Sequence, residues 1–126
     1  MVLDGNTVAR RVLIVEDEPL LAMNLEHMLT DVGHLVVATA TRINKALPLA
    51  ECSEIDPAIL DINLAGSNTF QVAAILRKRG IPFIFTSGYG RDGLVDGYRG
   101  AYLLTKPFGP SELEHMIAQS LSADVI

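Results

Sequence analysis

The sequence is poor in cysteine, in long hydrophobic runs and in clustered basic residues, and each shortage excludes a class of protein. Cys52 is the single cysteine, so no internal disulfide can form, which fits a reducing cytoplasm. No apolar run approaches the roughly 18 residues that a membrane span needs. The first residues also lack the basic start and the apolar middle of a signal peptide. We therefore expect a cytoplasmic protein that is not inserted into a membrane.

The chain is acidic, and its basic residues form no extended stripe. The net charge is −5, and the ten Lys and Arg residues are scattered apart from the run at residues 77–79. An acidic chain without a basic stripe binds nucleic acid poorly, so we expect no direct nucleic-acid binding. A length of 126 residues with 49% apolar side chains indicates one globular domain with a core. We assign this domain to residues 11–122, between an N-terminal extension at 1–10 and a C-terminal tail at 123–126.

Short apolar runs alternate with helical patterns along the chain. Strands are predicted at residues 11–16, 34–38, 58–63, 82–85 and 102–105. Apolar residues at helical spacing follow the first, second, third and fifth strands, and Ser111 is expected to cap the last helix. A fourth helix is weakened by five glycines between residues 88 and 100, each costing about 1 kcal/mol relative to alanine. Five strands alternating with five helices predict an α/β fold, with a doubly wound, five-stranded parallel sheet covered on both sides.

Polar side chains follow four of these strands at the point where each strand ends. They are Glu16 and Asp17 after the first strand, Asp61 in the third, Thr86 and Ser87 after the fourth, and Lys106 after the fifth. The carboxyl ends of parallel strands share one edge, where ligands of open α/β sheets bind, so these side chains are expected to form a site. Taken alone, Asp61 could equally begin a turn or cap the next helix.

Three carboxylates at one edge favour a bound cation. At about 5 Å and an effective dielectric near 20, each pair repels by roughly 3 kcal/mol. Oxygen ligands without His or thiolate select a hard ion, and few carboxylates with open positions favour Mg²⁺. A carboxylate, a lysine and a hydroxyl beside Mg²⁺ are suited to phosphoryl transfer. Asp61 is the predicted nucleophile.

These residues resemble the receiver domain of two-component response regulators over nearly the whole chain. The resemblance is carried by Glu16-Asp17, Asp61, the hydroxyl after the fourth strand, and Lys106-Pro107-Phe108. The stretch Phe85-Thr86-Ser87-Gly88 resembles further the Phe-Ala-Thr-Gly-type motif of stand-alone receivers from alphaproteobacteria. The family's fold implies a flavodoxin-like (βα)5 arrangement with strand order 2-1-3-4-5.

The resemblance also implies a role for each site residue. Asp61 is expected to accept the phosphoryl group, and Lys106 to pair with Asp61 and then with that group, followed by a cis Pro107. The expected Mg²⁺ ligands are Asp61, Asp17, the main-chain oxygen of Asn63, and Glu16 through a metal-bound water. Counting from Pro82, the switching hydroxyl falls on Ser87, with Thr86 as the alternative, and Gly88 is expected to leave the phosphoryl site open.

The expected function is that of a single-domain response regulator. A sensor histidine kinase or a histidine phosphotransfer protein is expected to supply the phosphoryl group, and a downstream protein partner to receive the signal. The domain is not expected to be an enzyme beyond its own phosphorylation and dephosphorylation. Leu103 occupies the place of the family's switching aromatic residue, and Tyr102 is expected on the opposite face of the strand.

Two other functions use a strand-end carboxylate or this fold. Phosphatases of the haloacid-dehalogenase type also have an aspartate nucleophile with Mg²⁺, but they need a second aspartate two residues on, where this chain has Asn63. A flavodoxin-like cofactor binder needs a hydroxyl-rich phosphate loop after the first strand, where Glu16-Asp17-Glu18 would repel a phosphate.

Overall fold

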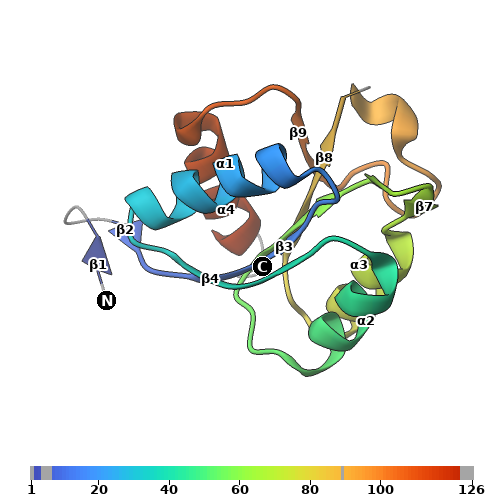
Figure 1. Cartoon of the computed structure of the whole chain (residues 1–126), viewed down its shortest axis with the longest axis horizontal. Helices are drawn as coiled ribbons and strands as arrows, with labels where there is room; N and C mark the ends of the chain where they lie inside the picture. Colours follow the sequence, from blue (N-terminus) through green and yellow to red (C-terminus); the bar gives the residue numbers. More distant parts are fainter. Residues whose placement is uncertain (1, 4–6, 89, 123–126) are drawn as a thin grey trace.

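A five-stranded parallel sheet with helices on both faces forms the centre of the molecule (Figure 1). The computed structural model describes residues 2–3, 7–88 and 90–122. The sheet's strands are β3 (Arg11–Val15), β4 (Leu35–Ala40), β5 (Ala58–Asp61), β8 (Phe83–Ser87) and β9 (Tyr102–Thr105). Their order across the sheet is β4-β3-β5-β8-β9, which is 2-1-3-4-5 when the five strands are counted along the chain. The predicted fold class and strand order are confirmed.

The helices divide between the two faces of the sheet. They are α1 (Pro19–Asp31), α2 (Ile43–Cys52), α3 (Phe70–Lys78) and α4 (Pro110–Ser122). Helices α1 and α4 cover one face and α2 and α3 the other (Figure 1). The three central strands are therefore buried on both sides, which is why their sequences are continuous apolar runs rather than alternating patterns.

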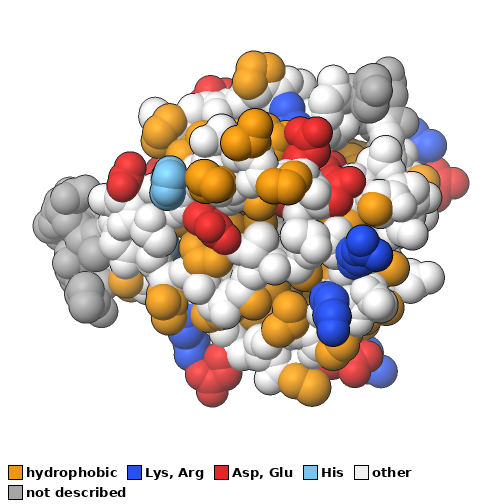
Figure 2. All heavy atoms as spheres, in the orientation of Figure 1, with side chains coloured by type: hydrophobic (Ala, Val, Ile, Leu, Met, Phe, Trp, Pro, Cys, Tyr) orange, Lys and Arg blue, Asp and Glu red, His pale blue; other side chains and the backbone are white. Residues whose placement is uncertain are grey.

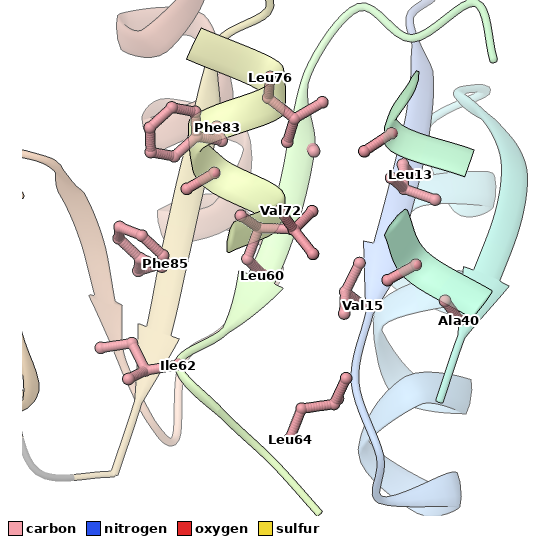
Figure 3. Packing of buried hydrophobic residues seen from close by; sticks show 14 of the residues in the cluster. Leu13, Val15, Ala40, Leu60, Ile62, Leu64, Val72, Leu76, Phe83 and Phe85 are labelled. Carbon is pink, nitrogen blue, oxygen red and sulfur yellow. The ribbon is translucent and has the colours of Figure 1, made fainter. Parts of the chain in front are cut away.

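Side chains alternate between two hydrophobic clusters along each central strand. The cluster beneath α1 and α4 contains Ile59 and Ile84, and the cluster beneath α2 and α3 contains Leu60 and Phe85. Figure 3 shows Leu60 of β5 against Val72 of α3 in the second cluster. Side chains along a strand point alternately to the two faces of the sheet. A residue two positions from a member of one cluster therefore points to the same face as that member.

A single turn of 3₁₀-helix stands where the fourth helix was predicted. It is η1 (Gly90–Gly93), and the chain between it and β9 has no helix. The expectation of five helices is therefore wrong for the described residues, which contain four α-helices. Glycines at 90 and 97 adopt positive φ angles of 63° and 91°, a conformation that interrupts an α-helix and that glycine adopts without steric cost. Leu94, 3% exposed, packs into the α2/α3 cluster in place of a helix.

The ends of the domain differ from the prediction in detail. Residues of the N-terminal extension form a two-stranded antiparallel pair, β1 (Val2–Leu3) with β2 (Thr7–Val8), which no sequence pattern indicated. Helix α4 begins at Pro110, so Ser111 lies inside its first turn and not at the cap. Pro110 suits the first helical position, where its missing N–H has no partner in any case. The Gly109 N–H, just before the helix, donates to Glu112 Oε1 at 3.1 Å. The predicted tail at 123–126 lies outside the described residues.

Each helix in the described part of the chain is too short or too polar to cross a lipid bilayer.

Candidate functional site

The site lies at the carboxyl edge of the sheet, where β3, β5, β8 and β9 end. Asp61, the last residue of β5, is in register with Thr86 of β8, and Ser87 is in register with Thr105 of β9. Parallel neighbours in register project their side chains to the same face. Asp61 and Thr86 therefore point toward the α1/α4 face, and Ser87 begins on the α2/α3 face.

Asp61 is held at the strand end by hydrogen bonds that involve its carboxylate, its carbonyl oxygen and the ammonium group of Lys106. The residue is 8% exposed. Its Oδ2 accepts a hydrogen bond from Lys106 Nζ at 3.1 Å, and its Oδ1 accepts one from the Asn63 N–H at 3.3 Å. The buried Thr69 hydroxyl donates to the Asp61 carbonyl oxygen at 2.7 Å. The Asp61 carboxylate is thus positioned by groups before α3 and after β9 at once.

Glu16 is the most deeply buried carboxylate of the site, with 1% of the residue exposed. Its Oε1 accepts from Lys106 Nζ at 3.0 Å, and its Oε2 accepts from the Glu18 N–H at 3.1 Å. Burial raises the pKa of the Glu16 carboxyl to about 7, and the nearby charge of Asp61 adds to the rise, against the lowering effect of the Glu18 N–H and of Lys106.

Lys106 bridges Glu16 and Asp61. Burial lowers the pKa of the Lys106 ammonium, but its hydrogen bonds with the two carboxylates raise it by more, so the net shift is upward. The ammonium therefore stays charged at neutral pH. The Lys106–Pro107 peptide is cis, as the family resemblance implied.

Asp17 joins the acids to a short hairpin that the sequence did not indicate. The hairpin consists of β6 (Asn63–Leu64) and β7 (Ser67–Asn68), joined through Ala65 and Gly66, both at positive φ. Asp17 Oδ2 accepts from the Ala65 N–H at 3.0 Å. This contact places Asp17 beside the loop that follows Asp61. It also leaves Asp17 with other lone pairs, because a carboxylate can accept several hydrogen bonds.

The acids form a group that suits a hard cation. Glu16, Asp17 and Asp61 each offer an oxygen atom, and these oxygens lie within 4.8 Å of one another. Lys106 supplies one positive charge against three carboxylates, so the site retains a net negative charge when all three are ionised. Carboxylate oxygens without nitrogen or sulfur are the donor set of Mg²⁺ rather than of zinc. The residues present therefore fit the predicted magnesium ion.

The two hydroxyls at the end of β8 occupy different surroundings. Ser87 is 5% exposed and follows Phe83 and Phe85 on the face of α2 and α3. A Cβ atom built on Gly93 would lie 4.0 Å from Ser87 Oγ and 3.5 Å from Ile62 Cδ1, which puts Ser87 near η1. Thr86 is 1% exposed on the Asp61 side. A Cβ atom built on Gly88 would meet nothing within 4 Å, so space remains around the strand end.

The structure thus brings together Glu16, Asp17, Asp61 and Lys106. Asn63 is exposed and contributes its N–H to Asp61, and the hydroxyl of Ser87 lies on the other face of β8. Thr69 was missed in the sequence, although its position directly before a helical pattern is where a hydroxyl typically stabilises a helix start. Tyr102 and Leu103 pack in opposite clusters, as predicted.

An apolar groove opens beside the acids on the α1 side. It has a volume of about 320 Å³ and is lined by Glu16, Leu21, Asn24, Leu25, Met28, Lys106, Pro107 and Phe108. Two further apolar side chains of α1 are exposed, Leu20 at 73% and Met23 at 48%. Figure 2 shows several exposed hydrophobic side chains where α1 runs, with acidic side chains near the end at which α1 begins. An apolar surface therefore borders the carboxylate site.

Comparison with known proteins identifies similar domains. The model of the family described as response regulator receiver domain matches residues 12–118. The phyllosphere-induced regulator PhyR of Methylorubrum extorquens is 36% identical over 119 residues, which cover 90% of this chain and 44% of PhyR. The transcriptional regulatory protein PdtaR of Mycobacterium tuberculosis is 34% identical, covering 91% of this chain and 58% of PdtaR. The chain spans about half the length of these curated relatives.

Solved structures agree with these matches. The response regulator PhyR from Brucella abortus superimposes with a TM-score of 0.80 at 36% identity, covering 94% of this chain and 50% of PhyR. SdrG from Sphingomonas melonis Fr1 superimposes with a TM-score of 0.76 at 38% identity, covering 94% of this chain and 98% of SdrG.

Proposed function

This chain belongs to the response regulator receiver family, and we propose that Asp61 accepts a phosphoryl group from a phosphohistidine in a magnesium-dependent reaction. The observation that carries the proposal is the position of the Asp61 carboxylate, at a strand end, hydrogen-bonded to Lys106 and within 4.8 Å of the oxygens of Glu16 and Asp17. The donor is a sensor histidine kinase or a histidine phosphotransfer protein.

The transfer is a displacement at phosphorus. An oxygen of the Asp61 carboxylate attacks, a P–O bond forms, the P–N bond to the donor imidazole breaks, and its electron pair stays on the imidazole nitrogen. Lys106 Nζ already lies 3.1 Å from Asp61 Oδ2. As the phosphoryl group arrives, the ammonium neutralises charge on the phosphoryl oxygens. Such positioning and charge neutralisation are the main contribution of proteins to phosphoryl transfer.

Glu16, Asp17, Asp61 and the main-chain oxygen of Asn63 are the groups proposed to hold Mg²⁺, with Glu16 acting through a bound water. When bound, the ion offsets the negative charge that the incoming phosphoryl group adds to three carboxylates. Ser87 is proposed to turn toward the phosphoryl group after transfer. Its carbonyl oxygen already accepts the Lys106 N–H at 2.8 Å, so movement at the end of β8 reaches the start of the loop after β9.

The apolar groove beside the site is proposed to receive the donor protein. A phosphohistidine must come within bonding distance of Asp61, so the surface that carries it must cover the neighbouring part of the receiver. The groove between α1 and the loop after β9 is lined by Glu16 and Lys106 themselves. Leu20 lies one helical turn before the lining residue Asn24 and is 73% exposed. Exposed apolar patches of this kind typically mark protein interaction sites.

The output is proposed to be a change in affinity for a downstream protein, or transfer of the phosphoryl group to a second histidine-containing protein. The phosphatase alternative is not supported. Such a phosphatase requires a second aspartate two residues after the nucleophile, and this chain has Asn63 at that position. The family model that matches residues 12–118 is that of receiver domains.

Incubation with acetyl phosphate tests the acceptor, with intact mass as the measurement. We expect the protein to gain one phosphoryl group with Mg²⁺, little without it, and none in Asp61→Asn. A variant without Asp61 that still gains the group would remove this residue from its role.

The same measurement with a phosphorylated histidine kinase tests the docking groove. Leu20→Glu is expected to slow transfer from the kinase about tenfold and to leave labelling by acetyl phosphate unchanged, because the small donor needs no docking surface. Leu35→Glu is the matched control, since Leu35 is also well exposed, at 59%, but begins β4 at the opposite end of the strands. Equal slowing in both variants would count against the groove.

A further inference from the structure

Thr86 lies on β8, between the strand that ends in Asp61 and the strand that leads to Lys106. It is in register with Asp61 of β5 on one side and with Leu104 of β9 on the other. Ile84, two residues earlier, and Leu104 both belong to the cluster beneath α1 and α4. By the period of the pleat, the Thr86 side chain projects to that same face, beside the side chain of Asp61.

The lysine of the site must pass over Thr86. Lys106 follows β9, yet its ammonium hydrogen-bonds Asp61 on β5 and Glu16 after β3. The sheet order places β8 between β9 and β5, so the Lys106 side chain spans β8 at the level where Thr86 lies. Thr86 is 1% exposed although it lies near the edge of the sheet at which the strands end.

The hydroxyl of Thr86 has no hydrogen-bond partner among the described residues. A buried polar group without a partner costs free energy, whereas a valine of the same shape does not. Thr69, the other fully buried threonine near Asp61, uses its hydroxyl to hold the Asp61 carbonyl oxygen at 2.7 Å. The two threonines therefore differ in whether the unmodified protein uses the hydroxyl.

We propose that Thr86 is a positioning residue of the phosphorylated state, whose hydroxyl donates a hydrogen bond to an oxygen of the phosphorylated Asp61 side chain. The inference rests on the proposed function of Asp61. In the unmodified protein Lys106 occupies Asp61 Oδ2. When Lys106 turns to the phosphoryl group, Thr86 is the neighbouring hydroxyl on that face that is able to donate. Rotation about its χ1 angle turns the hydroxyl without moving the strand.

This role differs from the one proposed for Ser87. The Ser87 side chain begins on the α2/α3 face, near Gly93 and Ile62, and reaches the phosphoryl group by moving around the strand end. Thr86 is already on the side of Asp61. The end of β8 thus carries one hydroxyl that must travel and one that needs only to rotate.

Thermal unfolding with and without beryllofluoride and Mg²⁺ tests the inference on the full chain. Beryllofluoride binds in place of a phosphoryl group, and the rise in unfolding midpoint depends on the ratio of its concentration to its dissociation constant, so the concentration needed for a given rise measures its affinity. Thr86→Val is expected to leave the midpoint of the unmodified protein unchanged or higher. It should raise the beryllofluoride concentration needed for a given rise in midpoint about fivefold, which corresponds to the loss of one ordinary hydrogen bond. Thr86→Ser, which keeps the hydroxyl, should stay within about twofold of the wild type.

Thr69→Val is the control for a hydroxyl that the unmodified protein does use, and it is expected to lower the midpoint before any beryllofluoride is added. If Thr86→Val lowers that midpoint as much as Thr69→Val does, the hydroxyl has a structural partner and the inference is wrong. Unchanged beryllofluoride affinity in Thr86→Val would overturn it equally. If the wild type responds to neither beryllofluoride nor acetyl phosphate, the proposed function itself fails. If the wild type responds normally and Thr86→Val has the same beryllofluoride affinity, only the inference about Thr86 fails.

Discussion

Glu16 shows how the fold sets the chemistry of a single residue. A carboxylate that follows an apolar strand is normally free to leave the sheet into water. Here the residue is 1% exposed, and it shares the Lys106 ammonium with Asp61. One positive charge cannot neutralise two buried neighbours and Asp17 as well. The raised pKa of Glu16 is the consequence, because burial and crowding both penalise the charged form.

The stability of the metal-free protein should depend on pH through Glu16. The pKa of about 7 in the folded state lies above the ordinary value of 4.5. Between these values the folded protein keeps a proton that the unfolded chain has lost. The free energy of unfolding should therefore fall as pH rises from about 5 to 7, by roughly 3 kcal/mol in all. Urea unfolding in EDTA at several pH values measures this change.

Glu16→Gln is the control, because it keeps the size of the side chain and cannot ionise. Its free energy of unfolding should lack this component of the pH dependence, so that the difference between the two proteins grows from pH 5 to 7. Parallel curves for wild type and variant would show that Glu16 does not titrate in this range.

At the scale of elements, the segment between β8 and β9 shows how a helix is replaced. Tyr98 packs against Phe70, Phe83 and Phe85, with ring centroids 5.2 to 6.1 Å apart, and the Arg77 guanidinium lies 4.2 Å from the centroid of the Tyr98 ring. Leu94 is buried under the same segment. Two large side chains thus cover the sheet where a helix would otherwise do so. The segment is still predicted to exchange amide hydrogens faster than α1, because its glycines cost more entropy to order.

Removal of the Leu94 side chain should loosen this segment in particular. Leu94→Ala is expected to cost about 2–4 kcal/mol of unfolding free energy and to speed hydrogen exchange from residue 90 to residue 100 more than in α1. Val95→Ala is the neighbouring control, since Val95 is 47% exposed and should change stability by less than about 0.5 kcal/mol. If exchange rises equally across the whole domain, Leu94 stabilises the global fold and not the segment.

His34 connects α4 to the start of the sheet. Its Nδ1 accepts the Arg10 N–H at 2.9 Å, and its Nε2 lies 2.6 Å from Glu114 Oε1. A ring nitrogen that accepts an N–H carries no proton, so the proton is on Nε2, which donates to Glu114. The contact with Glu114 is therefore a hydrogen bond from the imidazole N–H to a carboxyl oxygen.

Substitution of Glu114 tests this arrangement. Glu114→Ala should cost about 1–2 kcal/mol of unfolding free energy, because the buried Nε2–H loses its acceptor. Glu114→Gln keeps an acceptor oxygen and should cost less than half as much. Equal losses in the two variants, measured by urea unfolding at pH 7, would contradict a hydrogen bond from His34 Nε2 to an acceptor oxygen at position 114.

At the scale of the whole molecule, the distribution of charge favours protein partners over nucleic acid. The net charge is −5, and three acids gather at the edge of the sheet that carries the site. Binding to DNA depends on many contacts between basic side chains and phosphates. The exposed apolar residues of α1 instead offer a surface for another protein.

A gel-shift assay at low salt checks this expectation for the chain of 126 residues. We expect no sequence-selective binding to DNA, with or without phosphorylation. A known DNA-binding response regulator serves as the positive control. A selective complex that forms when Asp61 is phosphorylated would contradict the prediction.

The sequence by itself determined the sheet, its strand order through the family resemblance, and the gathering of Glu16, Asp17, Asp61 and Lys106. These features depend on local patterns and on one geometric rule. Buried parallel strands read as apolar runs, and their carboxyl ends meet at one edge. A polar residue at the end of each run is therefore assigned to the site without knowledge of any contact.

Only the tertiary structure decided which face of β8 each hydroxyl occupies, that Lys106 spans that strand, and that Glu16 is buried. It also decided that a 3₁₀ turn with Leu94 and Tyr98 replaces a helix, and that Gly109 and not Ser111 precedes α4. The pleat register, the burial of a carboxyl and the packing of a loop depend on neighbours that are distant in the sequence. Thr86 and Ser87 are adjacent in the chain, but a change of one residue moves a side chain to the other face of the sheet.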